Sequence, residues 1–136
     1  MSDATPPQRT IRVVAAVVEQ DGRYLITQRR AAAVLPLMWE FPGGKVEGGE
    51  TDSAALKREV MHRLGAEIAC GKLISFVSHP YEHYAVDLFL YECHIVKGTL
   101  EARAVNAFKW VVSGEFDQYP FTPADEASMN KLLGVS

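Results

Sequence analysis

Residues 43–66 place ionisable side chains around a glycine-rich loop and the helix predicted after it. Glu50 lies in the loop, and Arg58 and Glu59 lie on the helix. Carboxylates three or four residues apart share one helix face, and a glycine-rich loop lets backbone groups approach a phosphate or a cation. Phosphoanhydride cleavage needs such a site, because divalent cations neutralise the phosphate oxygens and activate the attacking water. We expect Arg58 to pair with Glu50 or Glu59 and to orient it.

The spacing in this segment resembles the Nudix box of the Nudix hydrolases, written G-x5-E-x7-R-E-U-x-E-E-x-G-U with U an aliphatic residue. Seven of the nine defined positions agree, and His62 and Arg63 replace the final Glu pair. The matching residues are Gly44, Glu50, Arg58, Glu59, Val60, Gly65 and, more weakly, Ala66.

The likeness extends over residues 11–133 and is to the MutT-like branch. It includes Arg29-Arg30-Ala31-Ala32, the run from Trp39 to Lys45, Trp110, and Pro123-Ala124-Asp125. The resemblance implies the Nudix fold, an α/β/α sandwich whose mixed β-sheet lies between the box helix and a C-terminal helix. It also implies a pyrophosphohydrolase that uses Mg or Mn. The substrate would be a nucleoside diphosphate derivative, most simply a nucleoside triphosphate cleaved to monophosphate and pyrophosphate.

Site roles follow from the same resemblance. Glu59 holds the metal or acts as the base, and the carbonyl of Gly43 also touches the metal. Arg58 and Glu50 complete the catalytic set. Lys45 and Arg29 are the residues expected to bind phosphate.

Three acidic positions of this machinery are lost. His62 and Arg63 replace the Glu pair, and Ala104 stands where MutT-like enzymes have a further Glu, six residues before the late Trp. The local charge therefore rises by four units. A guanidinium about 4 Å from a dication costs on the order of 8 kcal/mol at an effective dielectric constant of about 20. The sequence thus predicts weak hydrolysis or, alternatively, a domain that binds a nucleotide or another phosphorylated ligand without efficient turnover.

The residues around the replaced pair allow three interpretations. Glu59 and Arg63 are spaced i, i+4 in the favourable order, which fits a surface ion pair worth about 0.3–0.5 kcal/mol. Glu59 and His62 form Glu-x-x-His, which can bind Mn, Fe, Ni or Zn if further acidic ligands come from elsewhere. Arg63 with Lys45 and Arg29 can instead hold phosphates directly, which supplies the charge of a metal without its activation of water.

Two further sets of polar residues have competing roles. Asp125 stands where MutT-like enzymes read the base, and a carboxylate favours an exocyclic amine, as on cytosine or adenine. A helix N-cap is the other role open to Asp125. His79, Glu82 and His83 bracket a turn and form either a second metal cluster or a solvent-facing turn.

Strands and helices must position these side chains. Leu56, Val60 and Leu64 predict the buried stripe of the box helix, which leaves Arg58, Glu59, His62 and Arg63 on its other side. Thr51 or Asp52 is its predicted N-cap, and Gly65 its end. The predicted strands are Ile11–Val18, Arg23–Gln28 after an Asp21-Gly22 turn, Trp39–Phe41, Leu73–Ser78, Tyr84–Val96 and Ala107–Val112. The predicted helices are Ser53–Leu64, a short one capped by Ser113, and Ala124–Leu133, and residues 31–37 are a predicted loop.

Length and composition favour a single domain of residues 11–136 after a disordered lead-in of residues 1–10. The chain has 136 residues, of which 48% are hydrophobic and 23% charged, which argues against a disordered or fibrous protein. Its net charge of -3 is too balanced for bulk electrostatic binding of a nucleic-acid polymer. Cys70 and Cys93 form no metal motif, so we expect reduced thiols. Without an apolar leader or membrane span, the sequence predicts a cytoplasmic protein, and homodimerisation stays open because no residue fixes an interface.

Overall fold

Seven strands form one mixed sheet in the computed structural model, which describes residues 9–132. They are β1 (Arg9–Gln20), β2 (Arg23–Gln28), β3 (Trp39–Glu40), β4 (Gly43–Lys45), β5 (Glu67–Pro80), β6 (Tyr84–Lys97) and β7 (Ala107–Val111). The strand order is β3-β2-β1-β6-β5, with β4 also paired to β1 and β7 to β2. Among the described strands, β1 and β6 run parallel and the other pairs are antiparallel.

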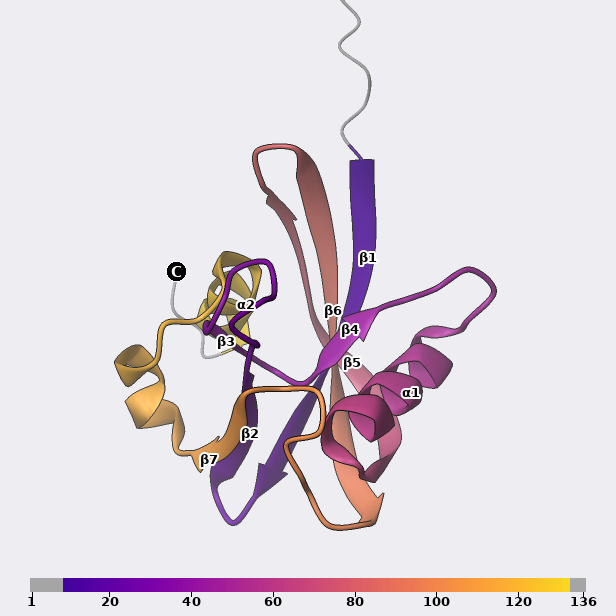
Figure 1. Ribbon diagram of the computed structural model, residues 1–136, viewed down its shortest axis with the longest axis vertical. Helices are drawn as coiled ribbons and strands as arrows, with labels where there is room; N and C mark the ends of the chain where they lie inside the picture. The colour runs from indigo at the N-terminus through magenta and orange to yellow at the C-terminus, as the bar shows by residue number, and fades with distance from the viewer. Residues whose placement is uncertain (1–8, 133–136) are drawn as a thin grey trace, which may run out of the picture.

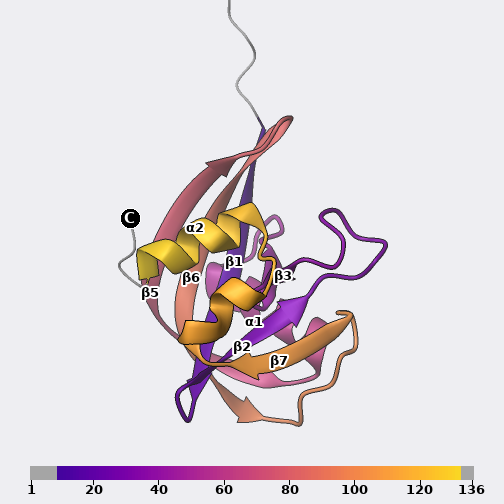
Figure 2. The same cartoon turned by 90° about the vertical axis from the view of Figure 1, so that its left-hand side faces the viewer.

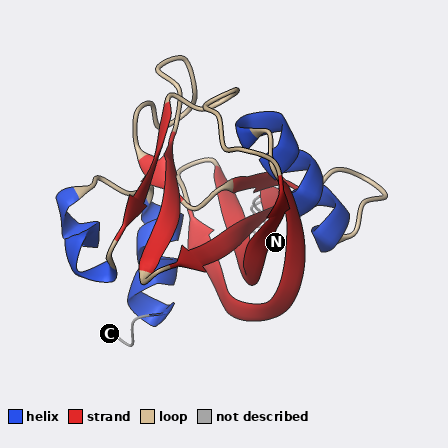
Figure 3. Cartoon of the chain, turned by 90° about the horizontal axis from the view of Figure 1, so that it is seen from below, coloured by secondary structure: helices blue, strands red, loops and turns tan. Residues whose placement is uncertain are grey.

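Helices cover both faces of this sheet. Figure 1 shows α1 (Asp52–Leu64) and α2 (Pro123–Leu132) on opposite sides of the strands, and Figure 3 shows the helices flanking the strands from below. Alternate residues of β1 enter two cores, because successive side chains of a strand point to opposite faces. Val14 and Ala16 pack in the core that contains residues of α1, whereas Ala15 and Val17 pack in the core that contains residues of α2. The predicted α/β/α architecture is confirmed.

α1 has the caps that the sequence predicts. The hydroxyl of Thr51 accepts the N–H of Ala54 at 3.1 Å, and Gly65 adopts a φ of 72° and donates its N–H to the carbonyl of Met61. Leu56 and Leu64 are fully buried, as expected. Glu59 was expected on the outward side but is only 7% exposed. The reason is the approach of β4, since the Glu59 carboxylate packs directly against Gly44.

Asp52 ties the start of α1 to the sheet. Its carboxylate accepts two hydrogen bonds from the Arg12 guanidinium of β1, at 2.8 and 2.7 Å, and one from the Tyr91 hydroxyl of β6 at 2.5 Å. These donors hold the pKa of Asp52 below its usual value, and the guanidinium of Arg12 also lies over the ring of Phe89. The N-terminal turn of α1 is therefore fixed against two adjacent strands.

Two strands have boundaries that differ from the prediction, and a glycine accounts for each difference. Gly43 was expected to stop the chain in a turn, yet it pairs with Ala15 as the first residue of β4. A Cβ at Gly43 would collide with the carbonyl of Val14, so glycine permits this close approach. β5 begins six residues before the predicted Leu73 because it continues through Gly71, near a shift of register.

The remaining differences lie at element ends. β1 begins at Arg9, so residues 9–10 belong to the sheet rather than to the predicted lead-in, of which residues 1–8 lie outside the described range. Ser113 was predicted as a cap but is the first residue of the 3-10 helix η1 (Ser113–Gln118), which precedes α2. α2 begins one residue earlier than predicted and packs across β5 and β6 (Figure 2), and residue 133 lies outside the described range.

Two further expectations concern the cysteines and the membrane. Cys70 and Cys93 are free thiols that face each other across β5 and β6. Burial raises the pKa of the Cys93 thiol to about 12. In the part of the chain that the structure describes, no helix has the length and apolar character needed to cross a membrane.

Candidate functional site

A cavity of about 460 Å³ opens beside α1, between the sheet and the start of α2. Its charged lining residues come from six separate parts of the fold. Its apolar wall is built mainly by β1, β6 and the loop between β2 and β3. The lining residues with ionisable side chains are Arg29, Glu40, Lys45, Glu47, Glu59, Arg63, Tyr81, Tyr84 and Asp125.

Gly43 and Gly44 bring β4 to the edge of this cavity. Both line it, and a Cβ at Gly44 would collide with the carboxylate of Glu59. Glu59 therefore lies against the backbone of β4 because position 44 has no side chain. Lys45, the next residue, is exposed and has no ion pair within residues 9–132.

Six side chains form a continuous series of alternating charge. Glu50 pairs with Arg58 at 2.7 Å, and Arg58 reaches Glu59 at 3.3 Å. Glu59 pairs with Arg63 at 3.1 Å, and Arg63 lies 3.9 Å from Glu40. Glu40 pairs with Arg29 at 3.2 Å. We call this set, Glu50-Arg58-Glu59-Arg63-Glu40-Arg29, the ion-pair series; its last four members line the cavity.

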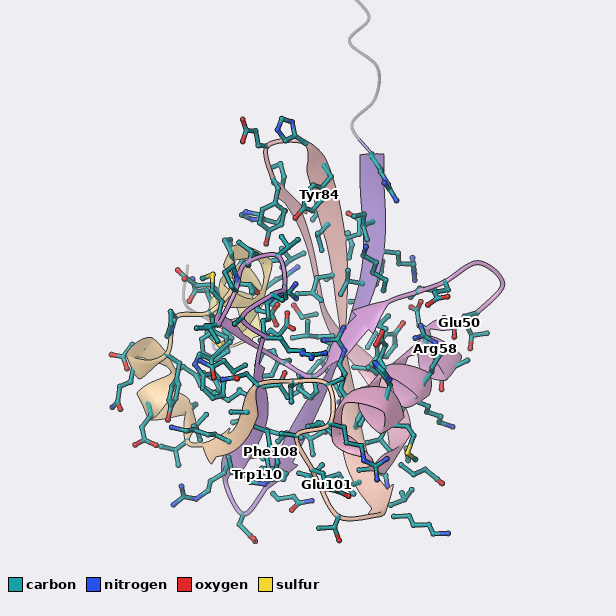
Figure 4. The ribbon with its side chains drawn as sticks, viewed as in Figure 1. Glu50, Arg58, Tyr84, Glu101, Phe108 and Trp110 are labelled. Atoms are coloured by element: carbon teal, nitrogen blue, oxygen red, sulfur yellow. The ribbon has the colours of Figure 1, made fainter. Side chains whose placement is uncertain are left out.

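The first pair of the series fixes the loop before α1. Arg58 donates from Nε and Nη2 to both oxygens of Glu50 and also to the carbonyl of Lys45. This contact lowers the pKa of Glu50 to about 2, with the hydrogen bond from Arg58 as the largest cause. Figure 4 labels Glu50 and Arg58 where the loop meets the helix. The predicted pairing of Arg58 is thus observed with both Glu50 and Glu59.

Asp125 is buried, and the half-buried carboxyl group of Glu40 lies in the same region. Asp125 lies in the first turn of α2, where Oδ1 accepts the N–H of Phe41 at 2.9 Å and Oδ2 accepts the hydroxyl of Thr122 at 2.8 Å. Burial and the negative charge of Glu40 raise the pKa of Asp125 to about 7. Burial also raises the pKa of Glu40, against the opposing effect of Arg29 and Arg63. Because Thr122 precedes the helix and Asp125 is its third residue, the N-cap role considered for Asp125 is wrong.

Comparison with known proteins identifies this architecture. A family model described as the NUDIX domain matches residues 13–131. The chain belongs to the Nudix family. Its box helix is α1, and the Nudix resemblance expected from the sequence is confirmed.

Curated relatives of this Nudix domain include nucleotide-cleaving enzymes. The CTP pyrophosphohydrolase of Escherichia coli (strain K12) is 40% identical over 129 residues, which cover 93% of this chain and 94% of the relative. The putative 8-oxo-dGTP diphosphatase 2 of Mycobacterium tuberculosis (strain ATCC 25618 / H37Rv) is 35% identical over 114 residues, covering 83% and 81%.

Solved structures share the Nudix fold. The solution structure of the E. coli ORF135 protein has a TM-score of 0.79 and 34% identity, covering 93% of this chain and 91% of that one. The crystal structure of the MutT protein from Methanosarcina mazei Go1 has a TM-score of 0.83 at 19% identity, covering 96% and 97%, and shows likeness of fold.

The Nudix resemblance implies Mg or Mn, but the residues present do not fit such an ion. Both oxygens of Glu59 are engaged by guanidinium groups, Oε1 by Arg63 and Oε2 by Arg58. Within residues 9–132, no three His, Cys, Asp or Glu side chains gather as a group that could hold a metal ion. A dication at Glu59 would lie beside two guanidinium charges, which repel it.

The Nudix domain does not bring every predicted ligand to its cavity. His62 is exposed and is not among the cavity residues, so it does not join Gly43 and Glu59 there. Glu82 and His83 form an exposed pair, with side chains 86% and 83% accessible. These positions favour the solvent-facing interpretation of that turn.

Glu40, Tyr81 and Tyr84 were missed as cavity residues by sequence reasoning. Glu40 links Arg29 and Arg63, which lie far apart in the sequence. The rings of Tyr81 and Tyr84 stack with centroids 5.2 Å apart, and Figure 4 shows Tyr84 on β6. Alternation along β6 could have placed Tyr84 on one face of the sheet, but no local signal predicts that α2 closes the cavity beside it.

Proposed function

We propose that this cavity binds a nucleoside triphosphate or a related nucleoside diphosphate derivative. The proposal rests on one observation: three cationic side chains and a buried carboxyl group line the same cavity. Arg29, Lys45 and Arg63 supply the cations, which suit phosphate oxygens. Asp125 supplies the carboxyl group, which suits the polar edge of a base.

The base preference follows from the bonding capacity of Asp125. In the ionised form of Asp125, each oxygen already accepts one hydrogen bond and has a second lone pair for a ligand. An exocyclic amino group, as on cytosine or adenine, donates to such an oxygen, whereas the carbonyl at the corresponding position of guanine does not. The name of the E. coli relative, CTP pyrophosphohydrolase, supports a cytosine nucleotide as the first ligand to test.

Hydrolysis to a monophosphate and pyrophosphate is proposed to be slow. Attack by water on phosphorus needs a group that removes a proton from the water. Glu59 is the box carboxylate that lines the cavity, and the guanidinium groups of Arg63 and Arg58 lie beside its two oxygens, so their positive charges oppose the uptake of a proton there. The same contacts favour a second candidate function, in which the domain binds a nucleotide and does not turn it over efficiently.

A nucleotide panel tests both functions. Pyrophosphate release would be measured for the four common nucleoside triphosphates and 8-oxo-dGTP, with magnesium and with manganese, beside calorimetric binding. We expect binding with turnover below about 1 per second, the lower end of the usual range for enzymes. Faster magnesium-dependent turnover contradicts the slow hydrolase and the binding domain alike, and the absence of binding by every nucleotide contradicts the proposal as a whole.

Restoring the acidic positions tests whether their loss limits hydrolysis. The triple variant His62→Glu, Arg63→Glu and Ala104→Glu lowers the local charge by four units, and we expect its magnesium-dependent pyrophosphate release to exceed that of the original chain. Lys57→Glu is the matched control, because Lys57 is an exposed residue of α1 outside the cavity. If activity fails to rise in the triple variant, the three positions do not limit catalysis.

A further inference from the structure

Arg63 is held with part of its guanidinium facing the cavity. Nε lies 3.1 Å from Oε1 of Glu59, and Nη1 lies 3.9 Å from Oε2 of Glu40. The side chain retains 25% accessibility, compared with 10% for Glu59 and 15% for Glu40. A guanidinium has five N–H donors, so these two carboxylates leave donors for a ligand.

The backbone around Arg63 is fixed as well. Its carbonyl accepts the N–H of Arg103 at 3.0 Å and that of Ala104 at 3.1 Å. Its carboxylate partner Glu59 packs against Gly44. The guanidinium therefore stands in place before any ligand arrives, which lowers the entropy lost on binding.

The other cations complete an anion site. Lys45 lines the same cavity and has no ion pair within the described residues, and Arg29 lines it as well and pairs with Glu40. A phosphate chain carries several oxygens, and guanidinium groups bind such oxygens in pairs. Lys45 thus supplies positive charge that no described carboxylate pairs with, and Arg29 and Arg63 supply N–H donors while Glu40 and Glu59 offset part of their charge.

We propose that the Arg63 guanidinium, held between Glu59 and Glu40, binds the phosphate of the ligand directly, so that nucleotide binding needs no divalent cation. This inference rests on the proposed function, because it assumes a nucleotide in this cavity. It adds that Arg63 supplies charge and hydrogen bonds without the activation of water that a metal provides.

Binding without metal is the decisive measurement. CTP and its nonhydrolysable α,β-methylene analogue would be titrated calorimetrically in EDTA and in magnesium. We expect affinities in EDTA equal to those in magnesium or up to about threefold tighter, since magnesium masks part of the phosphate charge. Binding that appears in magnesium and is lost in EDTA overturns this inference and leaves the proposed function standing. No binding to any nucleotide under either condition overturns both.

A variant series assigns the effect to Arg63. Arg63→Gln should weaken CTP binding in EDTA by about tenfold or more, the loss expected for charge-assisted hydrogen bonds. Arg63→Lys should keep part of the affinity, and Lys57→Gln should keep all of it. Circular dichroism would check that each variant folds. Equal affinity in Arg63→Gln and the original chain overturns the assignment.

Manganese provides a second readout that does not depend on activity, with circular dichroism again checking that the variant folds. Electron paramagnetic resonance would measure binding of Mn²⁺ alone to the original chain and to the double variant His62→Glu and Arg63→Glu. We expect binding by the double variant that is at least about tenfold tighter than by the original chain, because carboxylates suit Mn²⁺ and a guanidinium repels it. Equal or tighter binding by the original chain overturns the inference.

Discussion

The backbone N–H of Phe41 donates to Oδ1 of Asp125 at 2.9 Å, across 84 residues of sequence. This hydrogen bond joins the segment between β3 and β4 to the first turn of α2. Asp125 thereby connects two walls of the cavity, and its protonation affects both the fold and the ligand site.

Stability should fall as pH rises through the pKa of Asp125. The folded-state pKa of about 7 lies above the ordinary value of 3.8, so between these values the folded chain binds more protons than the unfolded chain. The contribution of Asp125 is therefore complete below about pH 4 and is lost as pH rises through about 7. Urea unfolding should show a smaller loss of free energy from about pH 5 to about pH 8 in Asp125→Asn than in the original chain.

Glu126→Gln is the control for that comparison, because Glu126 is exposed on the same helix. Glu40 contributes in the same direction as Asp125, and Arg29 faces both groups. The difference between the variant and the original chain isolates the Asp125 contribution. An equal loss of unfolding free energy in Asp125→Asn and in the original chain would contradict the raised pKa of Asp125.

Base preference should change in Asp125→Asn. An amide presents a donor as well as an acceptor, so the variant can donate to the carbonyl oxygen of guanine. Calorimetry with CTP, ATP and GTP should show a shift of relative affinity from CTP and ATP toward GTP. An unchanged ranking would leave Asp125 as a link between the segment that joins β3 to β4 and α2, with no part in reading the base.

Tyr91→Phe should destabilise the fold by about 1–2 kcal/mol, since it removes a hydrogen bond to the charged Asp52. Chemical denaturation would measure the free energy of unfolding. A double-mutant cycle with Asp52→Asn tests whether this contact is the cause, because residues in contact show a coupling energy above about 0.5 kcal/mol. Additive effects would place the loss elsewhere.

Gly44→Ala should weaken nucleotide binding, because the new Cβ would collide with the Glu59 carboxylate and displace the partner of Arg63. We expect a loss of about tenfold or more in affinity for CTP. Gly48→Ala is the matched control, since a Cβ there meets nothing within 4 Å. Similar affinities for the two variants would show that the position of Glu59 does not control binding.

Local sequence signals predict the helices well and the cavity only in part. Thr51 and Gly65 predict the ends of α1 because capping depends on neighbouring residues. The prediction at Gly43 is wrong because a glycine pair is typical of a turn. Here Gly43 belongs to β4, and that position depends on its close contact with β1. The burial of Glu59 follows from that same contact, so helical periodicity alone places it on the wrong side.

The contacts of Glu40 are the part of the site that the sequence does not predict. One of its two guanidinium partners, Arg29, directly follows β2, and the other, Arg63, lies on α1. Only the folded chain brings these two segments together. The box pattern correctly draws attention to Arg58, Glu59 and the replaced Glu pair. It does not include Glu40, and so it does not predict that Arg63 would have a second carboxylate beside it.

The ion-pair series has a consequence for how any anion enters the cavity. Its members alternate in sign, so each cavity-facing guanidinium already has a carboxylate partner from the same chain. An incoming phosphate uses the guanidinium donors that these carboxylates leave open, and it approaches while the carboxylates stay in place. Their negative charge opposes its own, so the net attraction is a small difference between larger opposing terms, and affinity is sensitive to the shape and charge of the incoming anion.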